Sequence, residues 1–239
     1  MTTSGESKVA LVTGANKGIG RAIVVGLAQR GFVVLLGARD AERGRVAAAE
    51  LASVGDIRVV ELNVLDDESV QAAVRSVRDG FRHLDVLVNN AGIALGSPKP
   101  SETSVPELRA VYETNVFAVV RVTNAFLPLL REAPAARVVN VTSKRGSLGD
   151  EGAWVGNPHM AYSSSKTALN ALTAHYAREL ATSAIKVNGA APGHVATDFN
   201  GFRGTRTPEQ GAAIALKLAT LGPDGPTGGV FEDAGQLVW

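Results

Sequence analysis

Residues 9–20 read Val9-Ala10-Leu11-Val12-Thr13-Gly14-Ala15-Asn16-Lys17-Gly18-Ile19-Gly20, so a short apolar run passes directly into a glycine-rich turn. Helical composition follows at 20–29, and a second apolar run starts at Phe32. Glycine lets a backbone turn tightly and approach a ligand, and a helix start offers free N–H groups to a phosphate. Because a strand pattern precedes the turn and a helix pattern follows it, we interpret it as a pyrophosphate cradle. A purely structural turn is the alternative.

Short apolar runs alternate with helical stretches along nearly the whole chain. Such a repeated strand–helix–strand order is typical of a parallel sheet with right-handed crossovers. We therefore predict an α/β fold: a single Rossmann-type domain over residues 1–239, with a doubly wound parallel β-sheet flanked by helices on both faces and a short disordered N-terminus of about residues 1–6. The predicted strands are 9–12, 32–36, 57–62, 84–88, 137–141 and 185–188, and the predicted helices are 20–29, 41–53, 67–78, 106–130, 162–182 and 208–220. Pro128 is expected to end or kink the fourth helix.

The composition restricts the function classes. The 239 residues include no cysteine, which fits a reducing compartment and excludes thiolate metal sites and a cysteine nucleophile. A net charge of +1 creates no strong field for nucleic acid or a membrane surface. No apolar run approaches the roughly 20 residues of a membrane span, and the polar start lacks the apolar stretch of a signal peptide. We expect a cytoplasmic protein that acts on a small molecule, without a nucleic-acid, membrane or metal partner.

The end of the second predicted strand bears on the choice of dinucleotide. NAD-selective Rossmann sites place an acidic residue there to hold the ribose 2′-hydroxyl. This chain has Ala38 at that position and Arg39 after it. A guanidinium binds phosphate well, so Arg39 favours the 2′-phosphate of NADP, with Lys17 as a second cation. The alternative is that Arg39 pairs with Asp40 or Glu42 on the surface.

Tyr162 alone among the three tyrosines has a lysine, Lys166, four residues further along the chain. Residues at this spacing share a helix face, and an ammonium stabilises a nearby phenolate and lowers the phenol pKa. Ser143 follows a predicted strand at the edge where α/β folds bind ligands, and its hydroxyl is suited to hold a carbonyl oxygen. Each of these features has a simpler interpretation when it is taken alone. Tyr162 and Lys166 could lie on a solvated helix face, Ser143 could merely end a strand, and residues 89–92 could form a turn.

Together these features resemble the short-chain dehydrogenase/reductase family. The resemblance rests on motifs in the family's order, which are 13–20, Asn89-Asn90-Ala91-Gly92, Asn115, Ser143, Tyr162-Ser163-Ser164-Ser165-Lys166 and Pro192-Gly193. Within the family, Lys17 to Gly20 with Ala38-Arg39-Asp40 is most similar to the NADPH-dependent carbonyl reductases.

The resemblance implies roles for four catalytic residues. Tyr162 would donate a proton to the carbonyl oxygen, Lys166 would lower the pKa of Tyr162 and bind the nicotinamide ribose, Ser143 would orient the carbonyl, and Asn115 would support a water relay to Lys166. The implied NADP(H) contacts are Gly14, Asn16, Lys17, Gly18, Ile19, Gly20, Arg39, Asn63, Val64, Asn90, Ala91, Gly92, Tyr162, Lys166, Pro192, Gly193, Val195 and Thr197. Asn63 departs from the family's usual aspartate, but its side-chain oxygen can still accept a hydrogen bond from adenine.

Three segments are expected near the substrate. The glycine-rich stretch 144–160 is interpreted as an entrance loop in which Trp154 covers an apolar substrate, with a packing tryptophan on a surface loop as the alternative. His159 and His194 should lie near the pocket, although a structural or exposed histidine is the simpler interpretation. Residues 198–208 suit a mobile lid whose Arg203 and Arg206 contact the cofactor phosphates, an anionic substrate or solvent. The segment 227–239 either closes the pocket or packs at an interface between subunits.

The sequence therefore predicts hydride transfer from NADPH to a ketone, aldehyde or quinone, with Tyr162 as the proton donor. A 3-oxoacyl thioester reductase or a dehydrogenase for one secondary alcohol is the alternative enzyme. A non-catalytic NADP sensor is the alternative from another class, but a sensor has no need of the Tyr162–Lys166 pair. A homodimer or homotetramer is expected, because the family often assembles through the helices that correspond to 106–130 and 162–182.

Overall fold

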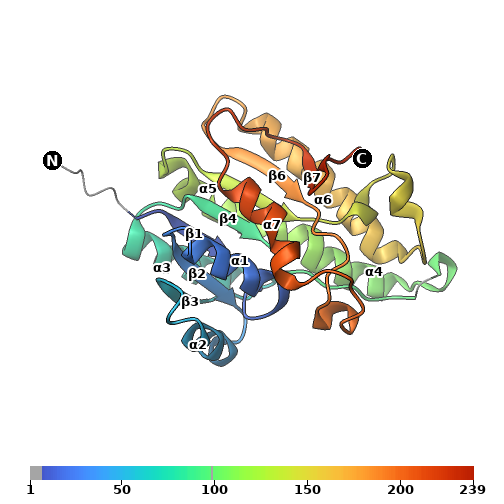
Figure 1. Cartoon of the computed structure of the whole chain (residues 1–239), viewed down its shortest axis with the longest axis horizontal. Coiled ribbons are helices and arrows are strands. Elements are labelled where there is room, and N and C mark those ends of the chain that lie inside the picture. The colour runs from blue at the N-terminus through green and yellow to red at the C-terminus, as the bar shows by residue number, and fades with distance from the viewer. Residues whose placement is uncertain (1–6, 98) are drawn as a thin grey trace.

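The computed structural model of the chain describes residues 7–97 and 99–239, so the predicted disorder at residues 1–6 lies outside the described residues. Their eight-stranded sheet has the order β3-β2-β1-β4-β5-β6-β7-β8 (Figure 1). The strands are β1 (Val9–Val12), β2 (Val33–Ala38), β3 (Ile57–Glu61), β4 (Val86–Asn89), β5 (Arg137–Val141), β6 (Lys186–Ala190), β7 (Val230–Glu232) and β8 (Gly235–Gln236). All pairs are parallel except β7 with β8. The predicted α/β fold is confirmed, and β7 and β8 are strands that the sequence did not predict.

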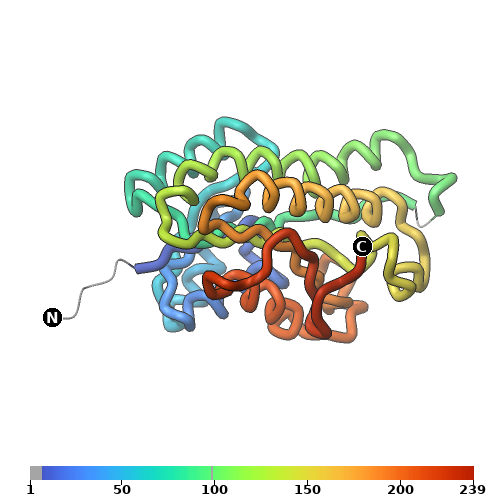
Figure 2. The backbone as a smooth tube through the Cα atoms, turned by 90° about the horizontal axis from the view of Figure 1, so that it is seen from above, coloured from blue at the N-terminus to red at the C-terminus, as the bar shows by residue number. Residues whose placement is uncertain are grey.

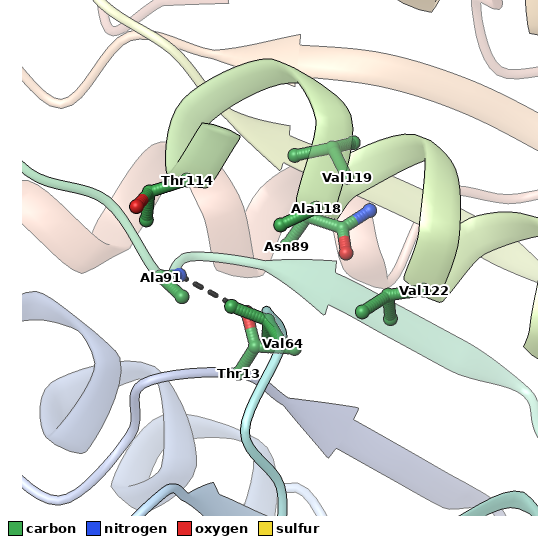
Figure 3. A pocket seen from close by; sticks show the side chains of 8 residues that line it. All are labelled: Thr13, Val64, Asn89, Ala91, Thr114, Ala118, Val119 and Val122. Carbon is green, nitrogen blue, oxygen red and sulfur yellow. Dashed lines mark hydrogen bonds between the residues drawn. The ribbon is translucent and has the colours of Figure 1, made fainter. Parts of the chain in front are cut away.

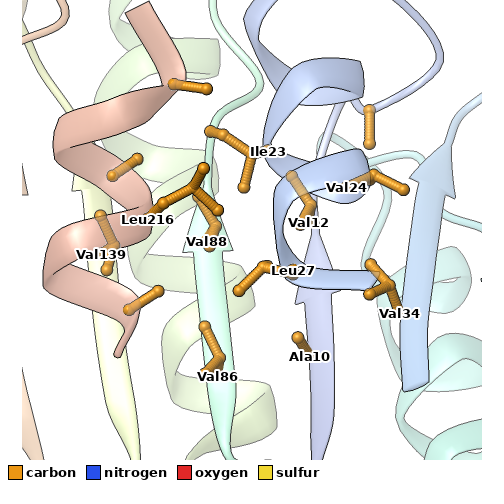
Figure 4. Close-up of a cluster of buried hydrophobic side chains, with 14 of the residues drawn as sticks. Ala10, Val12, Ile23, Val24, Leu27, Val34, Val86, Val88, Val139 and Leu216 are labelled. Atoms are coloured by element: carbon orange, nitrogen blue, oxygen red, sulfur yellow. The ribbon is translucent and has the colours of Figure 1, made fainter. Parts of the chain in front are cut away.

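Helices cover both faces of this sheet, which Figure 2 shows as layers above and below the strands. One layer holds α1 (Gly18–Ala28), α2 (Ala41–Glu50) and α7 (Pro208–Ala219). The other holds α3 (Asp67–Phe81), α5 (Ala118–Glu132) and α6 (Met160–Glu179). Helix α4 (Val105–Tyr112) precedes α5 in the chain. Each layer has its own hydrophobic core, and the first joins Leu27 of α1 and Leu216 of α7 to strand residues such as Val88 (Figure 4). Burial on both faces explains why the central strands are almost uninterrupted apolar runs.

The helix predicted at 106–130 is interrupted rather than continuous. A π-helical turn, Glu113–Phe117, separates α4 from α5. Of the two effects predicted for Pro128, it does not end the helix, because α5 continues to Glu132. Leu129 and Leu130 just beyond the proline are buried in the second core, and their packing outweighs the hydrogen bond that proline cannot donate. π-Helical turns are frequently found at functional sites.

The amino ends of the central strands are held by buried charged groups. Asp85, just before β4, accepts a hydrogen bond of 2.7 Å from the backbone N–H of Val9 and pairs with His83 at 3.2 Å. Arg137, at the start of β5, is 4% exposed and donates to the carbonyl oxygens of Leu221 and Gly222 after α7. The opposite edge of the sheet, at the carboxyl ends of the strands, carries every residue that the sequence analysis assigned to catalysis or to the cofactor.

Candidate active site

The glycine-rich turn after β1 has the backbone geometry of a phosphate cradle. Gly14 and Gly18 have φ values of +61° and +56°, a region that favours glycine. Lys17 is the N-cap residue of α1, and its side chain forms no capping hydrogen bond, so the first N–H groups of the helix stay available. A helix start of this kind attracts an anion through those N–H groups and through the helix dipole. The residues present therefore fit the pyrophosphate of a dinucleotide.

Thr13 joins the cradle to the segment after β4. Its hydroxyl oxygen accepts a hydrogen bond of 2.9 Å from the backbone N–H of Asn90. It also accepts one of 3.0 Å from the backbone N–H of Ala91 (Figure 3). The Asn90 amide donates in turn to the carbonyl oxygens of Thr13 and Gly14. A cavity of about 10 Å³, close to the volume needed for one water, is lined by Thr13, Val64, Asn89, Ala91, Thr114, Ala118, Val119 and Val122. Asn90 and Ala91 are thus held directly against the start of the cradle.

Asn89 has a different role from its neighbours in that motif. It is the last residue of β4 and is 4% exposed. Its amide donates to the side-chain oxygens of Asn140 on β5 and Thr123 on α5, and the Asn140 amide donates to Thr173 on α6. The Asn89 side chain therefore joins β4 to β5 and α5 beneath the site, and Asn140 extends this network to α6.

Arg39 lies exposed just after the carboxyl end of β2 and forms no ion pair within the described residues. Asp40 caps α2 and pairs with Arg43, while Glu42 pairs with Arg45. The surface pairing of Arg39 that competed with a cofactor role is therefore absent within residues 7–97 and 99–239. Arg43 and Asn16 line an open hollow of about 270 Å³ beside the cradle. Arg43 was not predicted as a site residue, although its spacing of four residues from Arg39 at a helix start was the available signal.

Lys17 has a partner that the sequence analysis did not anticipate. Its ammonium pairs with Asp198 of the 3₁₀ turn Asp198–Asn200, which follows β6. Thr197 lies against the cradle as well, because a Cβ built on Gly18 would be 3.3 Å from its methyl carbon. The segment after β6 therefore reaches across the carboxyl edge of the sheet to the cradle. Lys17 remains at the predicted place, but its charge is already compensated by Asp198.

Ser143, Tyr162 and Lys166 meet at the carboxyl end of β5. Ser143 follows the strand, and both other residues lie in the first two turns of α6, where their spacing of four puts them on one face. The Ser143 side chain lies close enough to Tyr162 to lower the pKa of its phenol. The Lys166 ammonium is 5.7 Å from the centre of the Tyr162 ring and donates to the carbonyl oxygen of Val141 at 2.8 Å. The predicted catalytic residues are thus adjacent in space.

Burial decides the direction of both pKa shifts at this site. It lowers the pKa of Lys166 to about 8, since the side chain is only 5% exposed. It also raises the pKa of Tyr162, an effect that outweighs the Ser143 hydroxyl and the positive charge of Arg145, which both lower it. The predicted net lowering of the Tyr162 pKa is therefore wrong for this structure. The phenol stays protonated at neutral pH and can act as an acid.

Asn115 lies in the π-helical turn and is fully buried. Its side-chain oxygen accepts from the backbone N–H of Ile93, and its amide donates to the Ile93 carbonyl and to the Ser165 hydroxyl. A Cβ built on Gly92 would be 3.3 Å from the Asn115 oxygen and 3.8 Å from the Lys166 ammonium. Asn115 therefore fixes the segment after β4 against α6, directly beside Lys166. In the structure it acts on Lys166 by positioning its surroundings.

The other predicted residues are distributed around this centre. Pro192, Val195 and Thr197 are buried after β6, whereas His194 is exposed and its carbonyl oxygen pairs with the N–H groups of Thr205 and Arg206. Asn63 follows β3, and its side-chain oxygen accepts from the N–H of Leu65, which leaves its second lone pair free. Trp154 is 67% exposed, and its ring forms no aromatic pair with Tyr162 among the described residues. The ring of Phe199 instead lies 5.6 Å from that of Tyr162, which was not predicted.

Similar proteins place this arrangement in a family. The profile described as short chain dehydrogenase matches residues 8–207. The chain belongs to the short-chain dehydrogenase family. A short-chain dehydrogenase of Penicillium roqueforti is 38% identical over 244 residues, which cover 95% of each protein. Carbonyl reductase (NADPH) 3 of Rattus norvegicus is 36% identical over 274 residues, with 97% of this chain and 96% of that protein covered.

A solved structure of this short-chain dehydrogenase group has the same fold. The NADPH-bound carbonyl reductase from chicken fatty liver has a TM-score of 0.87 at 27% identity, with 98% of this chain and 100% of that chain covered. The resemblance seen in the sequence is confirmed. As a short-chain dehydrogenase, the protein is an oxidoreductase that uses NAD(H) or NADP(H). Within the described part of this short-chain dehydrogenase, no helix is long and apolar enough to cross a membrane, and no group of three acidic or histidine side chains could hold a metal ion.

Proposed function

We propose that this short-chain dehydrogenase is an NADPH-dependent carbonyl reductase. The proposal rests on one observation: Ser143, Tyr162 and Lys166 meet at the strand edge that also carries the phosphate cradle. A carbonyl oxygen beside Ser143 and Tyr162 would accept hydrogen bonds from two hydroxyl groups. Both donors stabilise the negative charge that grows on that oxygen during reduction.

The choice of NADPH rather than NADH rests on the cations around the second strand. Arg39 forms no ion pair with a carboxylate of the described residues, and Arg43 and Asn16 border the adjacent hollow. A guanidinium binds a phosphate through charge-assisted hydrogen bonds, so Arg39 would hold the 2′-phosphate, with Asn16 and Arg43 beside it. The pyrophosphate would lie on the cradle and the nicotinamide beside Pro192 to Thr197. When bound, the cofactor supplies the hydride.

The protein's own residues supply the proton and the alignment. Tyr162 holds a proton at neutral pH and gives it to the carbonyl oxygen, which leaves a phenolate. The ammonium of Lys166 stabilises that phenolate, provided that Lys166 is charged. Ser143 orients the carbonyl through its hydroxyl, and Asn115 keeps Gly92 and α6 in place around Lys166. A water relay through Asn115 to Lys166 would return a proton to Tyr162.

The test is the loss of NADPH absorbance with a panel of ketones, aldehydes and quinones, measured for the wild type and for Tyr162→Phe. We expect turnover with NADPH and a decrease of about 10²–10⁴-fold in kcat for the variant, the usual contribution of a general acid. Cofactor affinity should change little, because the variant keeps the ring. Equal activity of both proteins would refute the role of Tyr162. Tight NADPH binding without turnover of any carbonyl would favour a nucleotide sensor.

A further inference from the structure

Several cations of the cradle and of the segments after β5 and β6 are paired with carboxylates. The ion pairs are Lys17 with Asp198, Lys144 with Asp150 and Glu232, and Arg206 with Asp233. Two arginines of the same segments, Arg145 and Arg203, lack such a carboxylate partner among the described residues. These two residues are called the arginine pair below.

Arg145 is held in place without losing its charge. It lies two residues after Ser143, and its backbone N–H donates to the Ser143 hydroxyl oxygen at 3.2 Å. Its guanidinium donates to the carbonyl oxygens of Asn157, at 2.7 Å, and Val155, at 3.1 Å. Carbonyl groups orient the guanidinium but leave a full positive charge beside Ser143. A guanidinium has five N–H donors, so three remain for a ligand.

Arg203 approaches the same centre from the segment after β6. Its Nε donates to the carbonyl oxygen of Asn200 at 2.9 Å, and its backbone N–H donates to the Asn200 side chain. Asn200 follows Phe199, whose ring lies against Tyr162. Arg203 is thereby anchored next to a residue that touches the proposed proton donor. Its terminal nitrogens form no hydrogen bond within the described chain.

His159 precedes the first turn of α6, which carries Tyr162, and both arginines act on it electrostatically. It is the N-cap residue of α6, half-buried, with left-handed backbone angles of φ 46° and ψ 59° that are unusual for a residue other than glycine. Burial lowers its pKa most, and the positive charges of Arg145 and Arg203 lower it further. The imidazole is therefore neutral near pH 7 and able to donate one hydrogen bond.

We infer that the arginine pair, together with His159, forms a subsite for an anionic oxygen group of the substrate, so that the enzyme reduces carbonyl compounds that carry a carboxylate or a phosphate. This inference rests on the proposed function for the position of the carbonyl. Arg145 lies two residues after Ser143, and Arg203 lies four residues after Phe199, whose ring is 5.6 Å from that of Tyr162, so both arginines belong to segments that border Tyr162. The cofactor phosphates would be bound elsewhere, the pyrophosphate at the cradle beside Lys17 and the 2′-phosphate at Arg39. Two unpaired guanidinium groups bind a carboxylate or phosphate in a planar, multiply hydrogen-bonded geometry.

The test compares benzoylformate with its methyl ester, which share a ring and a ketone but differ by one negative charge. For each protein the acid-to-ester ratio of kcat/KM is measured by NADPH oxidation. We expect Arg203→Gln and Arg145→Gln to lower this ratio at least about tenfold, which equals about 1.4 kcal/mol. Arg203→Lys keeps the charge and should retain most of the ratio. Arg75→Gln, on the exposed face of α3, is the matched control and should leave the ratio unchanged.

Dihydroxyacetone phosphate and dihydroxyacetone form a second pair, which separates phosphate from carboxylate. If the glutamine variants lower the charged-to-uncharged ratio of kcat/KM more for this pair, phosphate is the preferred group. If they lower the ratio more for benzoylformate and its ester, carboxylate is the preferred group. An unchanged ratio in both glutamine variants, for both pairs, would overturn the inference. High ionic strength should raise KM for the charged compounds only, because exposed charges are screened.

A binding measurement separates this inference from the proposed function. Benzoylformate is titrated by calorimetry into the wild type and the Arg145→Gln/Arg203→Gln protein, both with NADP⁺ present. A Kd at least about tenfold weaker in the double variant supports the anion subsite even if no carbonyl is reduced. An equal Kd overturns the subsite even if the methyl ester is reduced well. Thermal melting of each variant confirms that the compared proteins are folded.

Discussion

Replacing Thr13 by valine tests how the cofactor cradle is held to the sheet. The side chain is 1% exposed, and its hydroxyl oxygen is the acceptor for the N–H groups of both Asn90 and Ala91. Valine has nearly the same shape but no acceptor. Thr13→Val therefore leaves two N–H groups without a partner and creates no large cavity.

The magnitude follows from the number of donors affected. A buried polar group that loses its partner costs about 1–3 kcal/mol, so two cost about 2–6 kcal/mol. The residues of this segment are only partly buried, and water that reaches one of the groups reduces the cost to about 2–4 kcal/mol. For a chain of this size, 1 kcal/mol shifts Tm by about 2–4 °C. We expect Tm to fall by about 4–16 °C, and the Kd for NADPH to rise because Asn90 and Ala91 form the floor of the site.

The assay is thermal unfolding followed by circular dichroism, with NADPH affinity measured by fluorescence titration. Thr13→Ser is the matched control, since it keeps the acceptor and loses one buried methyl group, at a cost of about 1 kcal/mol. The valine variant should melt below the serine variant and bind NADPH more weakly. If valine melts at or above serine, with unchanged NADPH affinity, the hydroxyl contributes nothing and the reasoning is refuted.

Three further predictions concern charged groups. Arg39→Gln should lower the NADPH-to-NADH ratio of kcat/KM at least about tenfold, and an unchanged ratio would show that Arg39 does not bind the 2′-phosphate. The kcat/KM for reduction should be constant below pH 8 and fall above it. The reason is that the lowered pKa of Lys166, about 8, leaves the amine charged below that pH and neutral above it. A decline centred above about pH 10 would contradict this prediction. Arg137→Met should destabilise the protein by about 2–4 kcal/mol in urea unfolding, since the carbonyl oxygens of Leu221 and Gly222 lose a charged donor, while kcat per folded molecule stays the same. A loss of kcat without a change in stability would be the opposite of that expectation.

The sequence predicted the sheet well because its signals are local. Each central strand is a short apolar run between turn-forming residues, and the glycine cradle lies directly between strand and helix. Boundaries differ by a few residues, which matters at Asn89. Its strand extends one residue further than predicted, and its amide therefore lies in the core rather than toward the cofactor.

Features set by contacts between distant residues could not be predicted. Nothing in the sequence around Asn115 marks a π-helical turn, since the turn places the Asn115 side chain against Ile93, twenty-two positions earlier. The pairing of Lys17 with Asp198 spans 181 positions and depends on how the segment after β6 folds back. The raised pKa of Tyr162 has the same origin, because burial is a property of the packed site and outweighs the local charge pattern that predicted a lowered value.

The two edges of the sheet separate two kinds of evolutionary change. Substitutions in 143–159 and 198–206, at the carboxyl edge, alter which molecule meets Tyr162 while the strands beneath stay as they are. Substitutions at Asp85 or Arg137, at the amino edge, change the free energy of unfolding, and with it the number of destabilising substitutions that the protein tolerates at the other edge. A library that diversifies the first set and strengthens the second would therefore explore new specificities with fewer unfolded members.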